Sequence, residues 1–253
     1  MEQISATIIT RNEERNIERC LNALQGIADE IVVVDSYSTD RTLDICRRYG
    51  CKITSREFRG FGSQRQYAAG LTSYKYVLSV DADELIDEEL RECLIKMKAE
   101  GFKHRVYAMQ VNNYFCGRPV RHSGLEPTCH VRLFNKRYAN WNLHDVSDRV
   151  SYPDSVIPER LPGSIHHYRC ADLDEFARKE NRIAALQAKV IAAGNNSISP
   201  VTPHLRAGLE YLKSHVVDLA WLDGQAGHTI AGRRYKTTYE AWRMARHLIK
   251  ENK

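Results

Sequence analysis

Two periodicities alternate along the first hundred residues. Four short runs rich in β-branched and other apolar residues are typical of strands in a buried sheet: Ile4–Thr10, Ile31–Val34, Cys51–Thr54 and Tyr76–Val80. Each run is followed by a segment that we expect to be helical, and the first of these shows apolar residues at i, i+3, i+4 and i+7. These segments carry Ile17, Cys20, Leu21 and Leu24; Leu43 and Cys46 behind a capping Asp40; Ser63–Leu71; and Leu90, Cys93, Leu94 and Met97. The alternation predicts βαβ units and a Rossmann-like α/β fold, with a mostly parallel central sheet flanked by helices.

The pattern changes after about Val106. Two strand-like pieces, Val106–Asn113 and Cys129–Phe134, precede a long helical pattern from Asp172 to Ala193. The apolar residues expected on the inward stripe of this helix are Leu173, Phe176, Ile183, Leu186 and Val190. We therefore predict an α/β domain over residues 1–170 and a C-terminal helical extension over residues 171–253.

Composition excludes several classes of protein. With 253 residues, of which 43% are hydrophobic and 27% charged, the chain is neither disordered nor collagen-like. Seven cysteines without a C-x-x-C pair argue against a disulfide framework and a zinc site, so we expect reduced thiols. No apolar run approaches the ~20 residues that span a bilayer, and no leader pattern opens the chain, so we expect a cytoplasmic protein.

The last fifty residues mix apolar, aromatic and basic side chains. Residues 201–253 hold nine basic and five acidic residues, which accounts for most of the net charge of +5. The interleaved residues are Leu209, Tyr211, Leu212, Val216, Val217, Leu219, Trp221 and Leu222 with Arg206, Lys213, Arg233, Arg234, Lys236, Arg243, Arg246 and Lys250. The pattern fits an amphipathic helix on an anionic lipid surface, and equally a helical cap packed on the α/β domain.

Three polar clusters follow three of the predicted strands. The run Asp81-Ala82-Asp83-Glu84 comes directly after the strand ending at Val80, and the other clusters are residues 10–14 and 35–40. Ligands of a parallel sheet bind beyond the carboxyl ends of its strands, so we expect the clusters to converge. Closely spaced carboxylates there suit a divalent cation that bridges diphosphate oxygens. The alternative is that Asp83 or Asp87 caps the next helix, and that Asn12 and Ser38 are turn residues.

Four motifs in order resemble a known family. They are Ile8-Ile9-Thr10-Arg11-Asn12-Glu13-Glu14, Glu30 to Asp40, Gly62-Ser63-Gln64-Arg65-Gln66-Tyr67-Ala68, and Asp81-Ala82-Asp83-Glu84. Together they resemble the signature of family 2 glycosyltransferases, most closely the bacterial glucosyltransferases of lipopolysaccharide core assembly. The resemblance implies a GT-A fold, a nucleotide-sugar donor such as UDP-glucose, a divalent metal (Mg²⁺ or Mn²⁺) and inversion at the anomeric carbon. It also implies a lipid-linked or oligosaccharide acceptor, peripheral attachment to the cytoplasmic face of the inner membrane, and no nucleic-acid partner.

The same resemblance assigns residues to the donor. Asp35 matches the acid that contacts the base, Asp81 the acid that contacts ribose and metal, and Asp83 the principal metal ligand. The full set of expected donor-binding residues is Thr10, Arg11, Asn12, Glu13, Asp35, Ser36, Ser38, Arg65, Asp81 and Ala82. His167, in the Ile165-His166-His167-Tyr168 element after a Pro-Gly turn, is a further candidate metal ligand, although a His pair is also common as a structural feature.

The acceptor side matches the family in two further motifs, Arg132-Leu133-Phe134 and Trp141 to Asp145. A base must take the proton of the attacking hydroxyl, and we favour Asp145, with Glu126 as the competitor. Asp145 is alternatively a loop carboxylate paired with Arg149. Arg132 is expected to stabilise charge on the leaving diphosphate, or else to be a surface charge on a strand.

Two rival functions remain at this point. A sugar-phosphate nucleotidyltransferase would need a glycine-rich loop to grip a triphosphate, and Ile4–Glu14 contains no glycine. A non-enzymatic lipid- or nucleic-acid-binding module built on the basic tail would not need the acids at 81 and 83. The sequence therefore favours a metal-dependent inverting glycosyltransferase.

Overall fold

The computed structural model describes residues 2–143 and 148–251. The chain divides into two compact units. Unit 1 comprises Met1–Asn112 and Thr128–His167, and unit 2 comprises Asn113–Pro127 and Tyr168–Lys253. The second unit thus takes in a segment, 113–127, that lies well before the expected boundary at residue 170.

A single twisted sheet organises unit 1. Its strands, in spatial order, are β3 (Lys52–Ser55), β2 (Glu30–Asp35), β1 (Ile4–Thr10), β4 (Tyr76–Ser79), β8 (Thr128–Asn135), β6 (Val106–Phe115), β11 (Glu159–Cys170) and β5 (Glu84–Ile86). The first four strands pair in parallel, whereas β8 pairs antiparallel with both β4 and β6. The predicted α/β fold is confirmed, with a sheet that is parallel where strand and helix alternate and mixed beyond β4.

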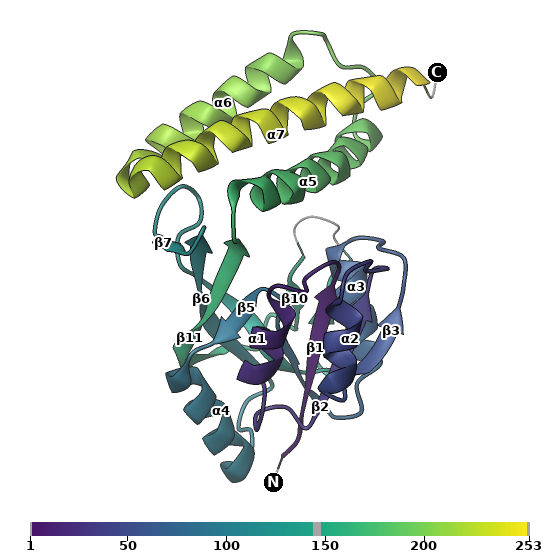
Figure 1. Cartoon of the computed structure of the whole chain (residues 1–253), viewed down its shortest axis with the longest axis vertical. Coiled ribbons are helices and arrows are strands. Elements are labelled where there is room, and N and C mark those ends of the chain that lie inside the picture. Colours follow the sequence, from purple (N-terminus) through teal and green to yellow (C-terminus); the bar gives the residue numbers. More distant parts are fainter. Residues whose placement is uncertain (1, 144–147, 252–253) are drawn as a thin grey trace. The chain divides into compact units, whose positions relative to one another are not determined.

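Both faces of this sheet are covered, which is why its central strands consist of unbroken apolar runs. The helices of unit 1 are α1 (Ile17–Ala23), α2 (Thr42–Arg48), α3 (Phe61–Gly70) and α4 (Glu88–Glu100) (Figure 1). Successive residues of β4 point to opposite faces. Tyr76 and Leu78 join the core formed with α1, α2 and α4, while Val77 joins a second cluster with α3 and the short pair β9 (Asn140–Trp141) and β10 (Val150–Ser151).

Strand β11 departs from the sequence expectation. Pro162 and Gly163 do not form a turn before the His pair but lie inside this twelve-residue strand. Gly163 has φ 74°, and a Cβ atom there would collide with the backbone nitrogen of Leu90 at the start of α4. A glycine is required because the strand passes directly against the helix terminus.

Unit 2 is helical. Its helices are α5 (Leu173–Ala193), α6 (Thr202–Val216), the 3₁₀ turn η1 (Ala220–Asp223) and α7 (Gly224–Glu251), and α7 packs against both α5 and α6 (Figure 1). The short strand β7 (Arg118–Val120) pairs with the end of β6. Asp172 caps α5 by accepting the N–H of Glu175 at 2.7 Å.

The inward stripe predicted for α5 is partly wrong. Phe176 is buried, but Leu173 and Val190 are each 55% exposed. The other buried positions of α5 are Ala184 and Ala188. The helix therefore packs a face that includes two alanines, which lets the backbones approach closely, and two of the five predicted inward residues face solvent instead.

No helix within residues 2–143 and 148–251 has the length and apolar character needed to cross a bilayer.

Candidate functional site

The loops that follow β1 and β2 are joined by hydrogen bonds. Thr10 and Asp35, the last residues of these strands, are partners in register. The Asn12 N–H donates to Ser38 Oγ at 2.8 Å, and Asn12 Oδ1 accepts the Thr39 N–H at 2.7 Å. Asn12 has φ 57°, a conformation that Asn tolerates better than most residues. The structure thus brings together two of the three predicted polar clusters, and Asn12 and Ser38 do serve as loop-forming residues.

Asp35 is the buried centre of this pair of loops. Its side chain is fully buried and accepts both the N–H of Ser38 at 2.9 Å and the hydroxyl of Ser38 at 2.5 Å. Ser36 is also buried and accepts a hydrogen bond from Gln64 Nε2 at 3.1 Å. Within the described residues, the buried oxygens Gln64 Oε1 and Thr10 Oγ1 have no hydrogen-bond partner. Buried polar atoms of this kind usually have one, so they mark a place where a polar ligand would complete the bonding.

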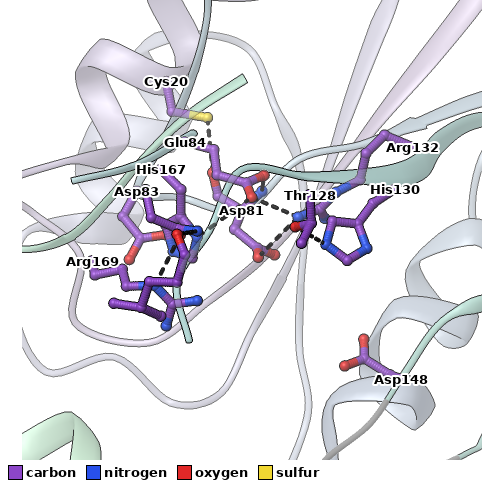
Figure 2. A network of polar contacts seen from close by, with 12 residues as sticks. Cys20, Asp81, Asp83, Glu84, Thr128, His130, Arg132, Asp148, His167 and Arg169 are labelled. Carbon is purple, nitrogen blue, oxygen red and sulfur yellow. Dashed lines mark hydrogen bonds and ion pairs between the residues drawn. The ribbon is translucent and has the colours of Figure 1, made fainter. Parts of the chain in front are cut away.

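Asp81 follows β4 and contacts two arginines, Arg65 and Arg132, of which Arg132 is seen in Figure 2. Arg65 Nη2 donates to both carboxylate oxygens of Asp81, at 2.6 and 2.7 Å, and Arg65 Nη1 contacts Asp148. The Arg65 guanidinium also lies 4.8 Å from the ring centroid of Trp141, a cation–π distance. Burial by itself would raise the pKa of Asp81, but Arg65 and then Arg132 outweigh that effect and hold the pKa below its usual value.

Glu84 and Arg132 form a buried ion pair beneath Asp81. Arg132 Nη2 lies 2.5 Å from Glu84 Oε1 and 3.8 Å from Asp81 Oδ2, while Glu84 Oε2 accepts the N–H of Asp81 at 2.9 Å (Figure 2). Burial raises the pKa of Glu84; the Arg132 guanidinium opposes the rise and the Asp81 carboxylate adds to it. Arg132 is 7% exposed, so the alternative of a surface charge on a strand is wrong.

Both arginines keep unused donors. In the part of the chain that the structure describes, Arg132 Nε and Nη1 and Arg65 Nε are buried without a hydrogen-bond partner. Buried guanidinium donors are costly to leave unpaired, and they match the oxygens of a phosphate group. The cluster therefore has guanidinium N–H groups available to bind an anion.

Asp83 lies beside His167. Strand β11 pairs antiparallel with β5 so that His167 stands opposite Glu84, and His167 Nε2 lies 3.3 Å from Asp83 Oδ1 (Figure 2). Asp87, not Asp83, caps α4, because it accepts the Leu90 N–H at 2.9 Å. Of the two residues that the sequence offered as caps of this helix, Asp87 is therefore the cap and Asp83 is not.

A divalent cation fits this donor set in one particular way. Within residues 2–143 and 148–251, no group of three or more His, Cys, Asp or Glu side chains is arranged to hold a metal. One carboxylate and one imidazole, Asp83 and His167, are adjacent, whereas Asp81 is paired with Arg65. Mg²⁺ is commonly bound by one or two carboxylates together with substrate phosphates, so these two side chains fit a cation that takes its remaining ligands from a diphosphate.

Other predicted site residues are placed differently. Arg11 is exposed, Glu13 is half-buried with its N–H on Thr42 Oγ1 at 2.9 Å, and Ala82 is buried. Glu126 is exposed and belongs to unit 2, where its Oε1 accepts the Gly124 N–H at 3.1 Å. Asp145 lies outside the described residues, so its role as base stays a prediction.

Sequence reasoning missed three participants. Glu84 stood in the quoted acidic run, and its position directly before an apolar strand residue was the available signal. Asp148 pairs with Arg65 across 83 positions, and the Cys20 thiol donates to the Asp81 carbonyl at 3.4 Å. Nothing local in the sequence marks either contact. Burial raises the pKa of Cys20 well above its usual value, with Glu84 and Asp83 adding to the shift, so this thiol is a neutral packing group.

Comparison with known proteins identifies the family of this chain. Residues 5–152 match the profile of glycosyl transferase family 2. The chain belongs to this family. Membership confirms the family resemblance that the sequence motifs suggested, and it decides against a nucleotidyltransferase and against a purely non-enzymatic module.

Individual relatives in the family are distant. The chain is 31% identical over 199 residues to an uncharacterized glycosyltransferase of Rickettsia bellii, covering 74% of this chain and 67% of the relative. It is 28% identical over 190 residues to the lipopolysaccharide core biosynthesis glycosyltransferase LpsC of Rhizobium meliloti, covering 73% and 70%. A solved structure of glucosyl-3-phosphoglycerate synthase from Mycobacterium tuberculosis with Mn²⁺, uridine diphosphate and phosphoglyceric acid is 20% identical, with a TM-score of 0.46 over 73% of this chain and 77% of that one.

Proposed function

We propose that this family 2 glycosyltransferase moves a glucosyl group from UDP-glucose, with inversion, to a lipopolysaccharide core or another cell-envelope glycan. One observation carries the proposal: the arginines Arg65 and Arg132, which keep unpaired buried guanidinium donors, contact Asp81 just beyond the carboxyl end of β4, two residues from Asp83 of the Asp83–His167 pair. Cationic donors and a metal-binding pair together suit a diphosphate leaving group.

The donor nucleoside would bind between the first two loops. Asp35 and Gln64 Oε1 are oriented by Ser38 and Ser36, so they present acceptors with little freedom to rotate. A nucleobase and a ribose offer N–H and O–H donors, and fixed buried acceptors select such groups by hydrogen bonding. Thr10 Oγ1 adds another buried oxygen without a partner among the described residues.

The diphosphate would bind next to Asp83. Asp83 and His167 would hold a divalent cation there, and the cation, when bound, neutralises negative charge on the diphosphate as it departs. Arg132 is fixed by Glu84 through Nη2, which leaves its Nε and Nη1 to donate to diphosphate oxygens. Arg65 would have to share its donors between Asp81 and the ligand, because two of its three nitrogens already bind carboxylates.

The reaction would be a single displacement. A carboxylate, Asp145 or alternatively Glu126, takes the proton of the acceptor hydroxyl as that oxygen attacks the anomeric carbon from the face opposite the diphosphate. The C–O bond to the diphosphate breaks, and the configuration at the anomeric carbon inverts. The proposal thus needs no covalent intermediate on the enzyme.

The acceptor assignment rests on similarity to LpsC, whose name records lipopolysaccharide core biosynthesis. A growing lipopolysaccharide core is attached to lipid, so we propose a peripheral location at the cytoplasmic face of the inner membrane. The excess of basic residues in 201–253 supports this location through attraction to anionic lipids.

The decisive experiment is calorimetric titration of a panel of nucleotide sugars, each with and without Mn²⁺ or Mg²⁺, followed by NMR of the product formed with a lipopolysaccharide core acceptor. We expect UDP-glucose to bind more tightly with metal, and an α-linked donor to give a β-linked product. Asp83→Asn should lose the metal effect, whereas the exposed Asp154→Asn should keep it.

Failure would be clear in either part of that experiment. If no nucleotide sugar in the panel binds, the proposed donor is wrong. A product that retains the donor's anomeric configuration would remove the single displacement.

A further inference from the structure

Helix α6 buries its small residues and exposes its large apolar ones, which is the reverse of what is expected of a helix in a globular domain. The residues that it buries are small or compact: Pro203, Ala207 and Ser214. Its leucines at 205, 209 and 212, together with Val216, are between 58% and 63% exposed. A surface helix ordinarily turns its large apolar residues toward the core, so this arrangement leaves apolar area in water that another surface would stabilise by covering.

These exposed residues form one continuous stripe. Leu205, Leu209, Leu212 and Val216 are separated by four, three and four positions, which places them along one side of a helix of about 3.6 residues per turn. We call these four residues the α6 outer face. Beyond the end of the helix the chain exposes more apolar side chains, namely Val217, Trp221 and Leu222.

Positive and titratable side chains border the α6 outer face. Arg206 and Lys213 lie along one side of the stripe, and His204 and His215 along the other, by the same helical spacing. Trp221 and Tyr211, 55% and 43% exposed, are residue types enriched where apolar and aqueous phases meet. A leucine face bordered by cations and interfacial aromatics is the pattern of a helix that lies on a membrane surface.

The two units also differ in net charge. Unit 2 contains sixteen Lys and Arg against ten Asp and Glu, whereas unit 1 contains 21 against 22. An anionic lipid surface complements this distribution. A second copy of the chain would instead bring the same positive unit against itself, which is unfavourable.

We propose that the α6 outer face is the membrane contact of this protein, with its leucines in the interface of an anionic bilayer and Arg206 and Lys213 at the lipid headgroups. The basic tail as a whole suggests membrane binding, and this proposal assigns that binding to one face of one helix. It rests on the proposed function, in which the acceptor is linked to lipid. Burial of the leucines supplies the apolar contribution, and the two cations supply a salt-sensitive one.

The test is co-sedimentation of the full chain with vesicles of phosphatidylcholine alone or of equal parts phosphatidylcholine and phosphatidylglycerol. We expect binding to the anionic vesicles that weakens as salt is raised. The double variant Leu209→Asp/Leu212→Asp should lower the partition coefficient by about tenfold or more. Lys213→Glu should lower it by about fivefold or more.

Matched controls separate this face from general effects. Leu173→Asp removes an equally exposed leucine from α5, and Lys236→Glu reverses an exposed lysine on α7. Both should bind vesicles as the wild type does. Circular dichroism of every variant checks that the helices are intact.

Two outcomes would overturn the proposal. One is equal loss of binding in the control variants, because net charge or hydrophobicity alone would then suffice. The other is a wild-type dimer, seen by light scattering, that Leu209→Asp/Leu212→Asp converts to a monomer without any change in vesicle binding; the α6 outer face would then be a self-association surface. Neither donor nor acceptor is present in this assay, so its result is independent of whether the glycosyl transfer is correctly assigned.

Discussion

The two units of this chain differ in which apolar and charged residues they bury and which they expose. Unit 1 fully buries the large apolar residues of its sheet core, such as Ile8, Leu78 and Leu90, and it also buries charged residues such as Glu84 and Arg132. Unit 2 buries mainly small residues, such as Ala207 and Ala241, exposes the leucines of α6, and carries more basic than acidic residues. The first arrangement fixes polar groups in a rigid site, and the second presents a surface.

The difference shows where each kind of function resides. A buried ion pair contributes little net stability but strongly restricts geometry, because either partner alone would be an uncompensated charge. Exposed leucines contribute little to the stability of the isolated protein, because they stay in contact with water after folding, and they stabilise only when another surface covers them. Substitutions in unit 1 should therefore act on folding and chemistry, and those on the α6 outer face on association.

The largest effect on stability is expected at Arg132. Arg132→Met leaves Glu84 buried without its cation and should lower the free energy of unfolding by about 3–5 kcal/mol, measured by urea denaturation. Arg59→Met, at an exposed arginine of the same unit, should change it by less than about 0.5 kcal/mol. Recovery of much of the loss in Arg132→Met/Glu84→Leu would confirm the buried charge as the cause; an Arg132→Met variant as stable as wild type would contradict it.

A smaller loss is expected at Gly163. Gly163→Ala combines a positive φ with a collision against the Leu90 backbone, so it should cost about 2–3 kcal/mol by thermal or urea unfolding. Gly70→Ala, which meets open space at the end of α3, is the matched control and should be neutral or slightly stabilising. Equal effects of the two substitutions would show that β11 does not press on α4.

Asp81 should show a pH-dependent loss. Its folded-state pKa lies below the unfolded value of about 3.9, so its ionised form stabilises the native state above that pH, and the contribution is lost as pH falls through the lowered folded pKa. Asp81→Asn should therefore cost about 2 kcal/mol at neutral pH and less in acid. The raised pKa of Glu84 has the opposite sign, and Asp81→Asn removes the carboxylate that adds to this rise, so the expected loss at neutral pH is a net value that includes this smaller gain. A wild-type minus variant difference that grows in acid would contradict this account.

The smallest loss is expected in unit 2. Asp223 accepts the N–H groups of Arg121 and His122, at 3.1 and 3.0 Å, and the hydroxyl of Ser123 at 2.7 Å. Asp223→Asn should cost about 1–2 kcal/mol by urea unfolding, because one of its oxygens is replaced by a donor. Hydrogen exchange at residues 121–123 should rise at the same time, and unchanged protection there would show that the loop is held by other contacts.

Local patterns were sufficient for much of unit 1. The first four strands and their helices follow from apolar runs and helical spacing, and the convergence of the polar loops at Thr10 and Asp35 follows from the parallel register. The sequence could not place β5 against β11, because their pairing joins residues about 80 positions apart and because β11 contains a Pro-Gly dipeptide that reads as a turn. Nor could helical spacing say which face is covered: Leu173 and Val190 lie on a regular stripe, yet an alanine face packs instead.

We propose that Asp83 and His167 hold a divalent cation that binds the donor diphosphate, and this step is the one on which the proposed transfer most depends. Electron paramagnetic resonance of Mn²⁺ tests it directly, by measuring Mn²⁺ affinity with and without uridine diphosphate. We expect uridine diphosphate to tighten Mn²⁺ binding to wild type and to Asp154→Asn, and Asp83→Asn to weaken Mn²⁺ binding by about 10- to 100-fold. Unchanged Mn²⁺ affinity in Asp83→Asn would show that Asp83 does not hold the cation.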